Sequence, residues 1–314
     1  MVRPQLTVRP WAPGDAPAVA ALLDAGADPL WVTQGHSLHG PNWQDGRRWR
    51  RTLVAQHGDQ VVGAASLATN RVHEGRLSCA VEVGAPWRRY GVGRTLLAAL
   101  RSVTSSPAVL SVKVRPGSPA HTFAVAAGAR QYQHCPGIRV DADDPVVGQW
   151  CAAIGADGSA DGDDRASGTS LTSLARVPRR ELEAAFVEQY TWVHREWSPV
   201  SSSRSLIEVA ETTIDELDRE VSTGAWVGNR LVATAFAFRN GNALDVVAET
   251  QSPAEPAGID AVARVVAGCL VRTAAAGIGR VEFDGHLTDP HLMPVLNSLP
   301  HSGSDPLLLL ELRC

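Results

Sequence analysis

The segment Val83–Leu97, V-G-A-P-W-R-R-Y-G-V-G-R-T-L-L, constrains the fold more than any other part of the chain. Residues 77–83 before it are almost all apolar, which predicts a buried strand. Apolar residues then recur at helical spacing, so Gly91 and Gly93 should open a helix. A strand that passes through a glycine loop into a helix can hold an anion, because the first backbone N–H groups and the positive end of the helix dipole face it.

The loop differs from two common phosphate-binding loops. It lacks the G-x-G-x-x-G of dinucleotide-binding folds, and no G-K-S or G-K-T follows it, as a Walker A loop would require. Three arginines, Arg88, Arg89 and Arg94, flank the glycines and would attract negative charge. The pattern therefore indicates a polyanionic ligand outside the two common nucleotide-binding classes.

Charge is divided unevenly along the chain. Residues 1–140 contain 16 basic and 7 acidic side chains, whereas the remaining 174 residues contain 13 and 26. A basic half suits a polyanionic ligand and an acidic half suits a cationic one. The alternative is that the two halves attract each other.

The order of predicted elements indicates two domains. Residues 155–170 are small, polar and acidic, as in a linker. Each half then gives helix, strands, helix, strand, helix and strand, including a closing strand at 131–140 and a helix at 211–222. We therefore expect an α/β (α+β) chain with two tandem domains, each a mixed, mostly antiparallel sheet flanked by helices. The expected boundaries are 1–145 for the first domain, 146–170 for an acidic Gly/Ser-rich linker and 171–314 for the second domain.

The remaining composition excludes several classes. The five cysteines are scattered, without a C-x-x-C pair or a histidine at ligand spacing, so neither a metal site nor a disulfide framework is expected. No apolar run is long enough for a transmembrane helix, and the N-terminus lacks the apolar core of a signal peptide. A cytoplasmic location and no membrane partner are expected.

The run V-x-x-P-x-R-x-x-G-x-G-x-x-L-L resembles motif A of the GNAT N-acetyltransferases. The opening L-T-V-R-P-W-A-P-G-D-A-P-A-V-A-A-L-L resembles the first strand and helix of that family, and residues 108–128 resemble the region after motif A. The resemblance covers about 140 residues. It implies an acyl-CoA domain with acetyl-CoA as cosubstrate. Residues 170–314 lack R-x-x-G-x-G and carry Glu249 and Glu255 at the corresponding place, which indicates a degenerate second GNAT-like domain.

The resemblance also implies roles for particular residues. The backbone of Val81, Glu82 and Val83 should run beside the pantetheine arm, and a gap between strands 77–83 and 108–114 should admit the thioester. Arg88 marks the first position of the motif. The N–H groups that should hold the pyrophosphate are those of Arg89, Tyr90, Gly91, Val92, Gly93 and Arg94.

Direct transfer requires a base that deprotonates the acceptor amine. Glu82 could serve if its side chain faces the cleft; the alternative is a carboxylate on the other face, paired with an arginine. His36 and His39 lie in a loop that would line the acceptor site, and an exposed loop without a site role is the alternative. The tyrosine that often protonates the departing thiolate in this family falls at Ala124, so the usual acid is missing.

These observations predict an N-acetyltransferase that moves an acetyl group from acetyl-CoA to a primary amine of a small, antibiotic- or metabolite-like molecule by direct transfer. Two alternatives stay open, namely a non-catalytic acyl-CoA-binding protein and an acyltransferase that uses aminoacyl-tRNA. No RNA-binding motif supports a nucleic-acid partner. A homodimer is compatible with the sequence.

Overall fold

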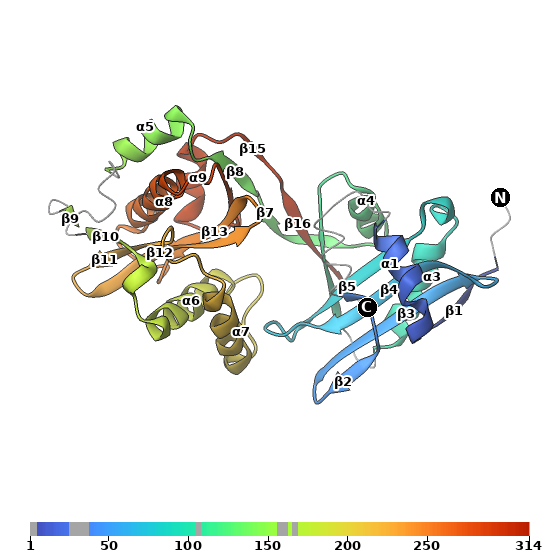
Figure 1. Ribbon diagram of the computed structural model, residues 1–314. Coiled ribbons are helices and arrows are strands. Elements are labelled where there is room, and N and C mark those ends of the chain that lie inside the picture. The colour runs from blue at the N-terminus through green and yellow to red at the C-terminus, as the bar shows by residue number, and fades with distance from the viewer. Residues whose placement is uncertain (1–4, 25–37, 105–107, 156–162, 165–168, 314) are drawn as a thin grey trace. The chain divides into compact units, whose positions relative to one another are not determined.

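The computed structural model describes residues 5–24, 38–104, 108–155, 163–164 and 169–313 (Figure 1). The chain forms two compact units. One comprises Met1–Gln131 with Leu309–Cys314, and the other comprises Tyr132–Leu308. The C-terminal end of the chain therefore belongs to the first unit, although most of the second half of the sequence forms the second.

The first unit is built on a mixed sheet. Antiparallel neighbours run from one edge as far as β5, and β5 and β6 are parallel. In spatial order the strands are β1 (Thr7–Pro10), β3 (Arg48–His57), β4 (Gln60–Thr69), β5 (Arg76–Val83), β6 (Val109–Val114), β16 (Leu307–Arg313) and β7 (Arg130–Cys135), with β2 (Trp43–Asp45) beside β3. An ion pair of 2.9 Å between Arg76 and Glu311 joins β5 to the C-terminal strand.

Helices cover both faces of this sheet (Figure 1). On one face, α3 (Val92–Ser102) buries Leu96 and Leu100 in a core that includes Leu67 and Cys79. On the other, α1 (Ala16–Asp24) packs Val19 and Leu23 against Val54 and Ala64. A further helix, α4 (Pro119–Ala126), places Phe123 against the α3 core.

The second unit repeats this arrangement around its own sheet. Its strands in spatial order are β15 (Gly303–Ser304), β8 (Ile138–Asp141), β14 (Arg280–Phe283), β13 (Ala243–Thr250), β12 (Arg230–Asn240), β11 (Thr223–Val227), β10 (Thr169–Ser173) and β9 (Asp163–Asp164). Every neighbouring pair is antiparallel except β13 and β14, which are parallel. The structure thus has two mixed, mostly antiparallel sheets flanked by helices, which confirms the predicted fold class.

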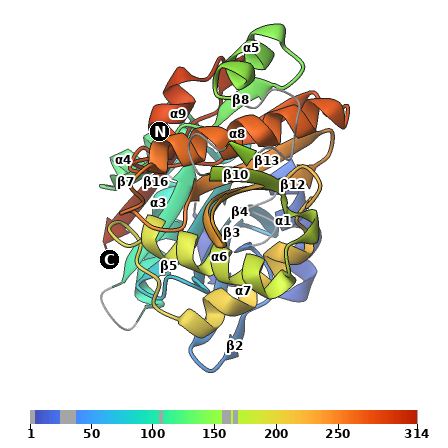
Figure 2. The same cartoon turned by 90° about the vertical axis from the view of Figure 1, so that its left-hand side faces the viewer.

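The long helix α8 (Gly258–Ala275) packs on one face of the second sheet, and α6 (Arg179–Val193) with α7 (Ser203–Asp215) packs on the other (Figure 2). The alternation along β12 explains the two cores: Ala235 and Ala237 lie in the α8 core, whereas Phe236 lies in the α6–α7 core. The helices α5 (Pro145–Ala153) and α9 (Leu292–Ser298) complete the α8 core.

The structure differs from the sequence analysis at three places. The closing strand expected at 131–140 is two strands, β7 and β8, in different sheets, because Pro136 cannot donate to a ladder. The units consequently divide at Gln131 and Leu308, which differs from the expected boundaries, and α5 occupies the start of the expected linker. The helix expected at 211–222 is α7, which begins earlier because the Ser202 side chain caps it.

Within the described residues, we find no helix that combines the length and the apolar character needed to cross a bilayer.

The start of α1 depends on one buried carboxylate. Arg9 donates from both terminal nitrogens to Asp15, at 2.7 and 2.6 Å, and the Ala12 N–H donates to Asp15 at 2.8 Å. The Arg9 guanidinium, against the opposing effect of burial, holds the pKa of Asp15 below its usual value. The contact fixes α1 against β1 and therefore fixes one face of the first unit.

We expect Asp15→Asn to unfold at a lower temperature than wild type at pH 7, by roughly 2–4 °C for about 1 kcal/mol. A carboxylate whose pKa is lowered by folding stabilises the folded state above its unfolded pKa of about 3.9 and loses that effect as the pH falls. Calorimetry should therefore find that the difference shrinks as the pH falls below about 4 and is lost once the pH is below the lowered pKa of Asp15 in the folded protein. The exposed Asp59→Asn is the control and should not change the midpoint; a difference that persisted in acid would contradict the ion-pair explanation.

Candidate functional site

The parallel strands β5 and β6 pair only over a short stretch. Arg76, Leu77 and Ser78 face Val109, Leu110 and Ser111, and pairing stops there although both strands continue. A cavity of about 60 Å³ lies where they separate. Its lining is apolar apart from Cys79 and Ser111, and includes Val81, Val112 and Phe123. The gap expected between these two strands is thus present.

The glycine loop leads from the end of β5 into α3. Gly91 is the N-cap and has a left-handed φ of 92°, which a residue without Cβ adopts without strain. The first helical hydrogen bond joins the Thr95 N–H to the Gly91 carbonyl, at 3.0 Å. Helix geometry therefore directs the N–H groups of Val92, Gly93 and Arg94 out of the helix end. Phe123 of α4 packs so closely that a Cβ on Gly93 would lie 3.2 Å from its ring.

The three arginines of the loop are not equivalent. The Arg88 Nε donates to the Val83 carbonyl at 3.0 Å, and its Nη2 lies 3.3 Å from the Glu82 carboxylate. Arg88 thus extends back along the end of β5, and the carbonyl of Val83 already has a donor. Arg89 and Arg94 are exposed at the start of α3. These two supply the positive charge beside the helix end.

Glu82 is buried and paired. Its carboxylate accepts the Val83 N–H at 3.1 Å as well as the Arg88 guanidinium. Glu82 faces Ala64 in the register of β4 and β5, so it lies on the α1 face, whereas Cys79 and Val81 belong to the α3 core. This is the arrangement that the sequence analysis named as the alternative to a cleft-facing base.

A second polar group lies on the same face of the first sheet. The His39 Nδ1 is 2.8 Å from the Ser66 hydroxyl, which donates to the Thr52 hydroxyl at 2.9 Å. All three side chains are buried. His39 is therefore part of the interior and not of an exposed loop, and Ser66 and Thr52 are partners that the sequence pattern did not indicate. His36, the other histidine candidate, lies outside the described residues.

Ala124, which stands where the resemblance to the GNAT family would place a tyrosine, lines the cavity. Ala124 of α4 is buried and contributes to the same lining as Cys79 and Ser111. Within the described lining, Ser111 is the side chain with a hydroxyl. A thiolate formed in this gap would meet a serine and a thiol where a phenol was expected.

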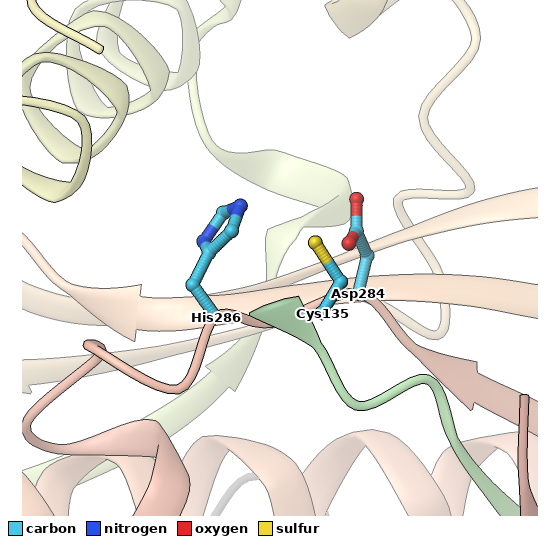
Figure 3. A group of neighbouring side chains, drawn as sticks. All are labelled: Cys135, Asp284 and His286. Atoms are coloured by element: carbon cyan, nitrogen blue, oxygen red, sulfur yellow. The ribbon is translucent and has the colours of Figure 1, made fainter. Parts of the chain in front are cut away.

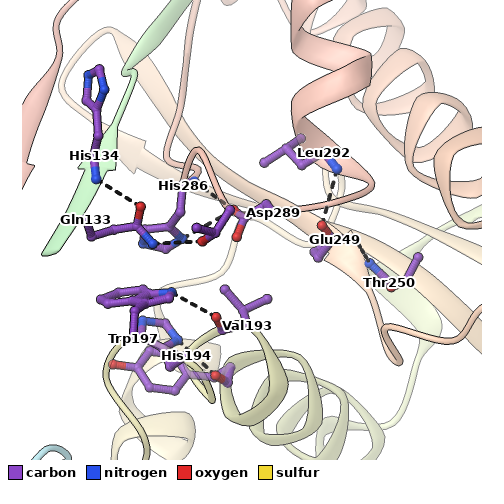
Figure 4. A network of polar contacts seen from close by, with 12 residues as sticks. Gln133, His134, Val193, His194, Trp197, Glu249, Thr250, His286, Asp289 and Leu292 are labelled. Carbon is purple, nitrogen blue, oxygen red and sulfur yellow. Dashed lines mark hydrogen bonds and ion pairs between the residues drawn. The ribbon is translucent and has the colours of Figure 1, made fainter.

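The second unit has the same strand separation with different contents. Pairing of β13 with β14 ends at Val246 and Phe283, and the Asp284 N–H then donates to the Val246 carbonyl at 2.9 Å. Beyond this point β13 carries Glu249, which occupies the last position but one of its strand, as Glu82 does in β5. The Glu249 carboxylate accepts the Thr250 N–H at 2.7 Å (Figure 4), the same local contact that Glu82 makes.

Glu249 fixes the start of α9. It accepts the His291 Nδ1 at 2.9 Å and the Leu292 N–H at 3.2 Å, and burial raises its pKa. A Cβ on Gly258 would lie 2.5 Å from the His291 ring, so this imidazole fills the space beside the start of α8. In the second unit, a histidine therefore packs where the first unit presents an open helix end.

Glu255 lies in the segment that leads to α8. It forms two hydrogen bonds with Arg230, at 2.7 and 3.0 Å, and the hydrogen bonds with Arg230 lower the pKa of Glu255. This pairing satisfies the carboxylate within the second unit.

One cluster was missed by the sequence analysis. Ligand-type atoms of Cys135, Asp284 and His286 lie within 4.8 Å of one another (Figure 3). Burial lowers the pKa of His286, but Asp289 and Cys135 outweigh it and raise that pKa to about 10. Because Cys135 is separated from the other two residues by most of a domain in sequence, no spacing pattern could have indicated the cluster.

Aromatic rings adjoin this cluster (Figure 4). His194 stacks on Tyr190 at 3.8 Å, and the Trp197 ring lies 4.5 Å from His194 and 4.6 Å from His286. Burial, with the charge of Asp284 as a further cause, raises the pKa of Tyr190 to about 12. The rings shield one side of His286.

No family model matches the sequence, and no characterised protein matches it in a sequence search. Solved structures do match over nearly the whole chain. A GCN5-related N-acetyltransferase from Sphaerobacter thermophilus is similar over 98% of this chain and 95% of that chain, with a TM-score of 0.62 and 15% identity. A tandem GNAT protein from the clavulanic acid biosynthesis pathway is similar over 98% of both chains, with a TM-score of 0.59 and 19% identity.

A GCN5-related N-acetyltransferase from Anabaena variabilis is similar over 97% of this chain and 72% of that chain, with a TM-score of 0.54 and 11% identity. At such low identities the likeness establishes the fold alone. The chain therefore has the tandem GNAT fold.

We expect Gly258→Ala to destabilise the second unit by about 1–3 kcal/mol, because the added methyl group would displace His291 from Glu249. The matched control is Gly148→Ala in α5, where a Cβ would meet no atom within 4 Å. This change should be neutral or should stabilise by up to about 1 kcal/mol, since alanine is the better helix former. Urea unfolding measures both; equal effects would show that the contact with His291 is unimportant.

Proposed function

We propose that this protein is an N-acetyltransferase that moves an acetyl group from acetyl-CoA to a primary amine of a small molecule, and that the first unit holds the donor. The observation that carries the proposal is the separation of β5 from β6 beside an open helix end. An extended thioester could lie in the gap while its pyrophosphate meets the N–H groups of α3. The likeness in fold to proteins named as acetyltransferases supports this assignment.

In the donor site, the part of β5 beyond its pairing with β6, from Cys79 to Val83, would run beside the pantetheine arm. Arg88 already binds the Val83 carbonyl, so we propose that Val81 offers the principal backbone groups and that Arg88 fixes the end of the strand. Arg89 and Arg94, with the N–H groups of residues 89–94, would hold the pyrophosphate. The apolar cavity excludes water from the thioester.

In the reaction, a neutral amine attacks the thioester carbonyl carbon, a carbon–nitrogen bond forms, and the carbon–sulfur bond breaks. The amine loses a proton and the departing thiolate gains one. We propose Glu82 as the proton acceptor for an amine that approaches the gap from the α1 face, because Glu82 is a buried carboxylate on that face at the end of β5. His36 is a second proposed base.

A non-catalytic acyl-CoA-binding protein is the second candidate function. The specific observation in its favour is Ala124, because the described residues that line the cavity then include no phenol. Turnover distinguishes the two functions, because binding alone releases no free thiol.

The donor site predicts the effect of neutralising the loop. Acetyl-CoA should bind the double variant Arg89→Gln, Arg94→Gln about 10- to 100-fold more weakly than wild type, since each lost charge-assisted contact costs roughly 1.4 kcal/mol. Calorimetric titration measures this. Arg101→Gln, at the other end of α3, removes the same charge and should change affinity less than about twofold. Equal affinity in the double variant and wild type would contradict the assignment of the loop to pyrophosphate binding.

Glu82→Gln tests the base. We expect kcat to fall by about 100-fold or more, with acetyl-CoA affinity nearly unchanged, because general base catalysis contributes at this scale. Thiol release with a polyamine, an aminoglycoside and amino acids as acceptors provides the assay, and Glu74→Gln is the control. A normal kcat in Glu82→Gln would move the base to another residue, and thiol release with none of the amines would favour the binding protein.

A further inference from the structure

We propose that the second unit binds a divalent transition metal, of which Zn²⁺ is the probe, through Cys135, Asp284 and His286. This inference concerns residues apart from the proposed donor site and stands or falls independently of the proposed acetyl transfer. The three side chains come from the end of β7, from the residue after β14, and from the loop that follows (Figure 3). They point into one space, although Cys135 is far from the other two in sequence.

The donor set fits a borderline-soft metal. A thiolate, an imidazole and a carboxylate are the three ligand types that Zn²⁺ takes in proteins, at about 2.3, 2.0 and 2.1 Å respectively. Tetrahedral ligation places such atoms about 3.3–3.8 Å apart. The observed separations between the ligand atoms are all within 4.8 Å, so these atoms need to approach one another by about 1 Å to coordinate an ion. Hard cations such as Mg²⁺ prefer oxygen ligands and would be disfavoured by the sulfur.

His286 is oriented in the way that metal-binding histidines are. Its Nδ1 lies 3.2 Å from the Asp289 carboxylate, which also accepts the His286 backbone N–H at 2.7 Å. A carboxylate on one ring nitrogen fixes the ring and leaves Nε2 as the ligand atom. Asp289 is buried and also helps to begin the turn before α9, so this orientation is built into the fold.

The surroundings leave one coordination position for solvent or substrate. Cys135 is buried and Asp284 is exposed, so the set is closed on one side and open on the other. The rings of Trp197 and His194 pack against His286 and restrict its movement (Figure 4). Three protein ligands with an open position are typical of catalytic zinc sites, whereas structural sites use four.

The strand separation explains why this cluster exists. The Asp284 N–H donates to the Val246 carbonyl of β13, just beyond the paired stretch, and the chain then leaves β14 through the loop that carries His286. The end of β7 brings Cys135 to the same edge. The place that forms an apolar cavity in the first unit therefore gathers three ligand atoms in the second.

Cobalt(II) titration of the full-length, chelator-treated protein tests the proposal. Wild type should give a near-ultraviolet thiolate-to-cobalt charge-transfer band that saturates at one ion per chain and disappears when Zn²⁺ is added. Cys135→Ala should lose the band, and His286→Ala should lose it or bind cobalt at least tenfold more weakly, whereas Cys151→Ala, which removes a buried cysteine from the same unit, should retain it. Asp289→Asn should weaken affinity by about 10- to 100-fold while the band keeps its shape.

A wild-type protein without this band overturns the proposal whether or not the variants fold, and so does a band that persists in Cys135→Ala. Circular dichroism verifies the fold of each variant. If Cys135→Ala unfolds, peptide mapping after alkylation of wild type decides instead: Zn²⁺ should slow modification of Cys135 and leave Cys151 unaffected. If Zn²⁺ protects Cys135 and Cys151 equally, or protects neither, metal ligation by Cys135 is contradicted.

Discussion

The parallel pairing of β5 with β6 ends after Ser78 and Ser111, and the candidate donor site depends on that ending. Parallel strands that stay paired leave no free backbone edge and no space between them. Here β5 continues without β6, so its edge and the cavity beside it become available to an extended ligand. The glycine loop follows within a few residues, which places the positive end of α3 at the end of the same gap.

Packing on the two faces keeps the gap open. On one face Leu96 and Leu100 of α3 join the core of the sheet, and Phe123 of α4 packs against Gly93, so both walls are held by separate helices. On the other face, Glu82 and Arg88 tie the end of β5 to the loop. The loop is therefore shaped by contacts between residues close in sequence, whereas the walls of the cavity are shaped by contacts between distant segments. For this reason the loop could be predicted from the sequence and the cavity could not.

This contrast explains how much could be predicted. The strand, glycine loop and helix from residue 77 to 103 follow local pattern, and both the fold class and the elements of motif A were predicted from it. Local pattern could not predict that Leu307–Arg313 completes the first sheet, because the apolar pattern of a strand does not specify which sheet it joins. Nor could it place Ser66 and Thr52 beside His39, because that contact arises from register between β3 and β4. The cluster at Cys135 is a similar case, in which separate segments meet only after folding.

The two units show how one architecture can support different chemistry at an equivalent place. A glutamate occupies the last position but one of β5 and of β13, and in both units its carboxylate turns back to the next N–H. In the first unit the second partner is Arg88, which leaves the helix end open and positive. In the second unit it is His291, whose ring packs against Gly258 and fills that end. A pyrophosphate would have to displace a buried imidazole from a buried carboxylate, and Arg230, near the start of α8 through its contact with Glu255, is already paired with that carboxylate. The second unit is therefore unsuited to the donor, and the polar residues at its strand separation are available for a different ligand.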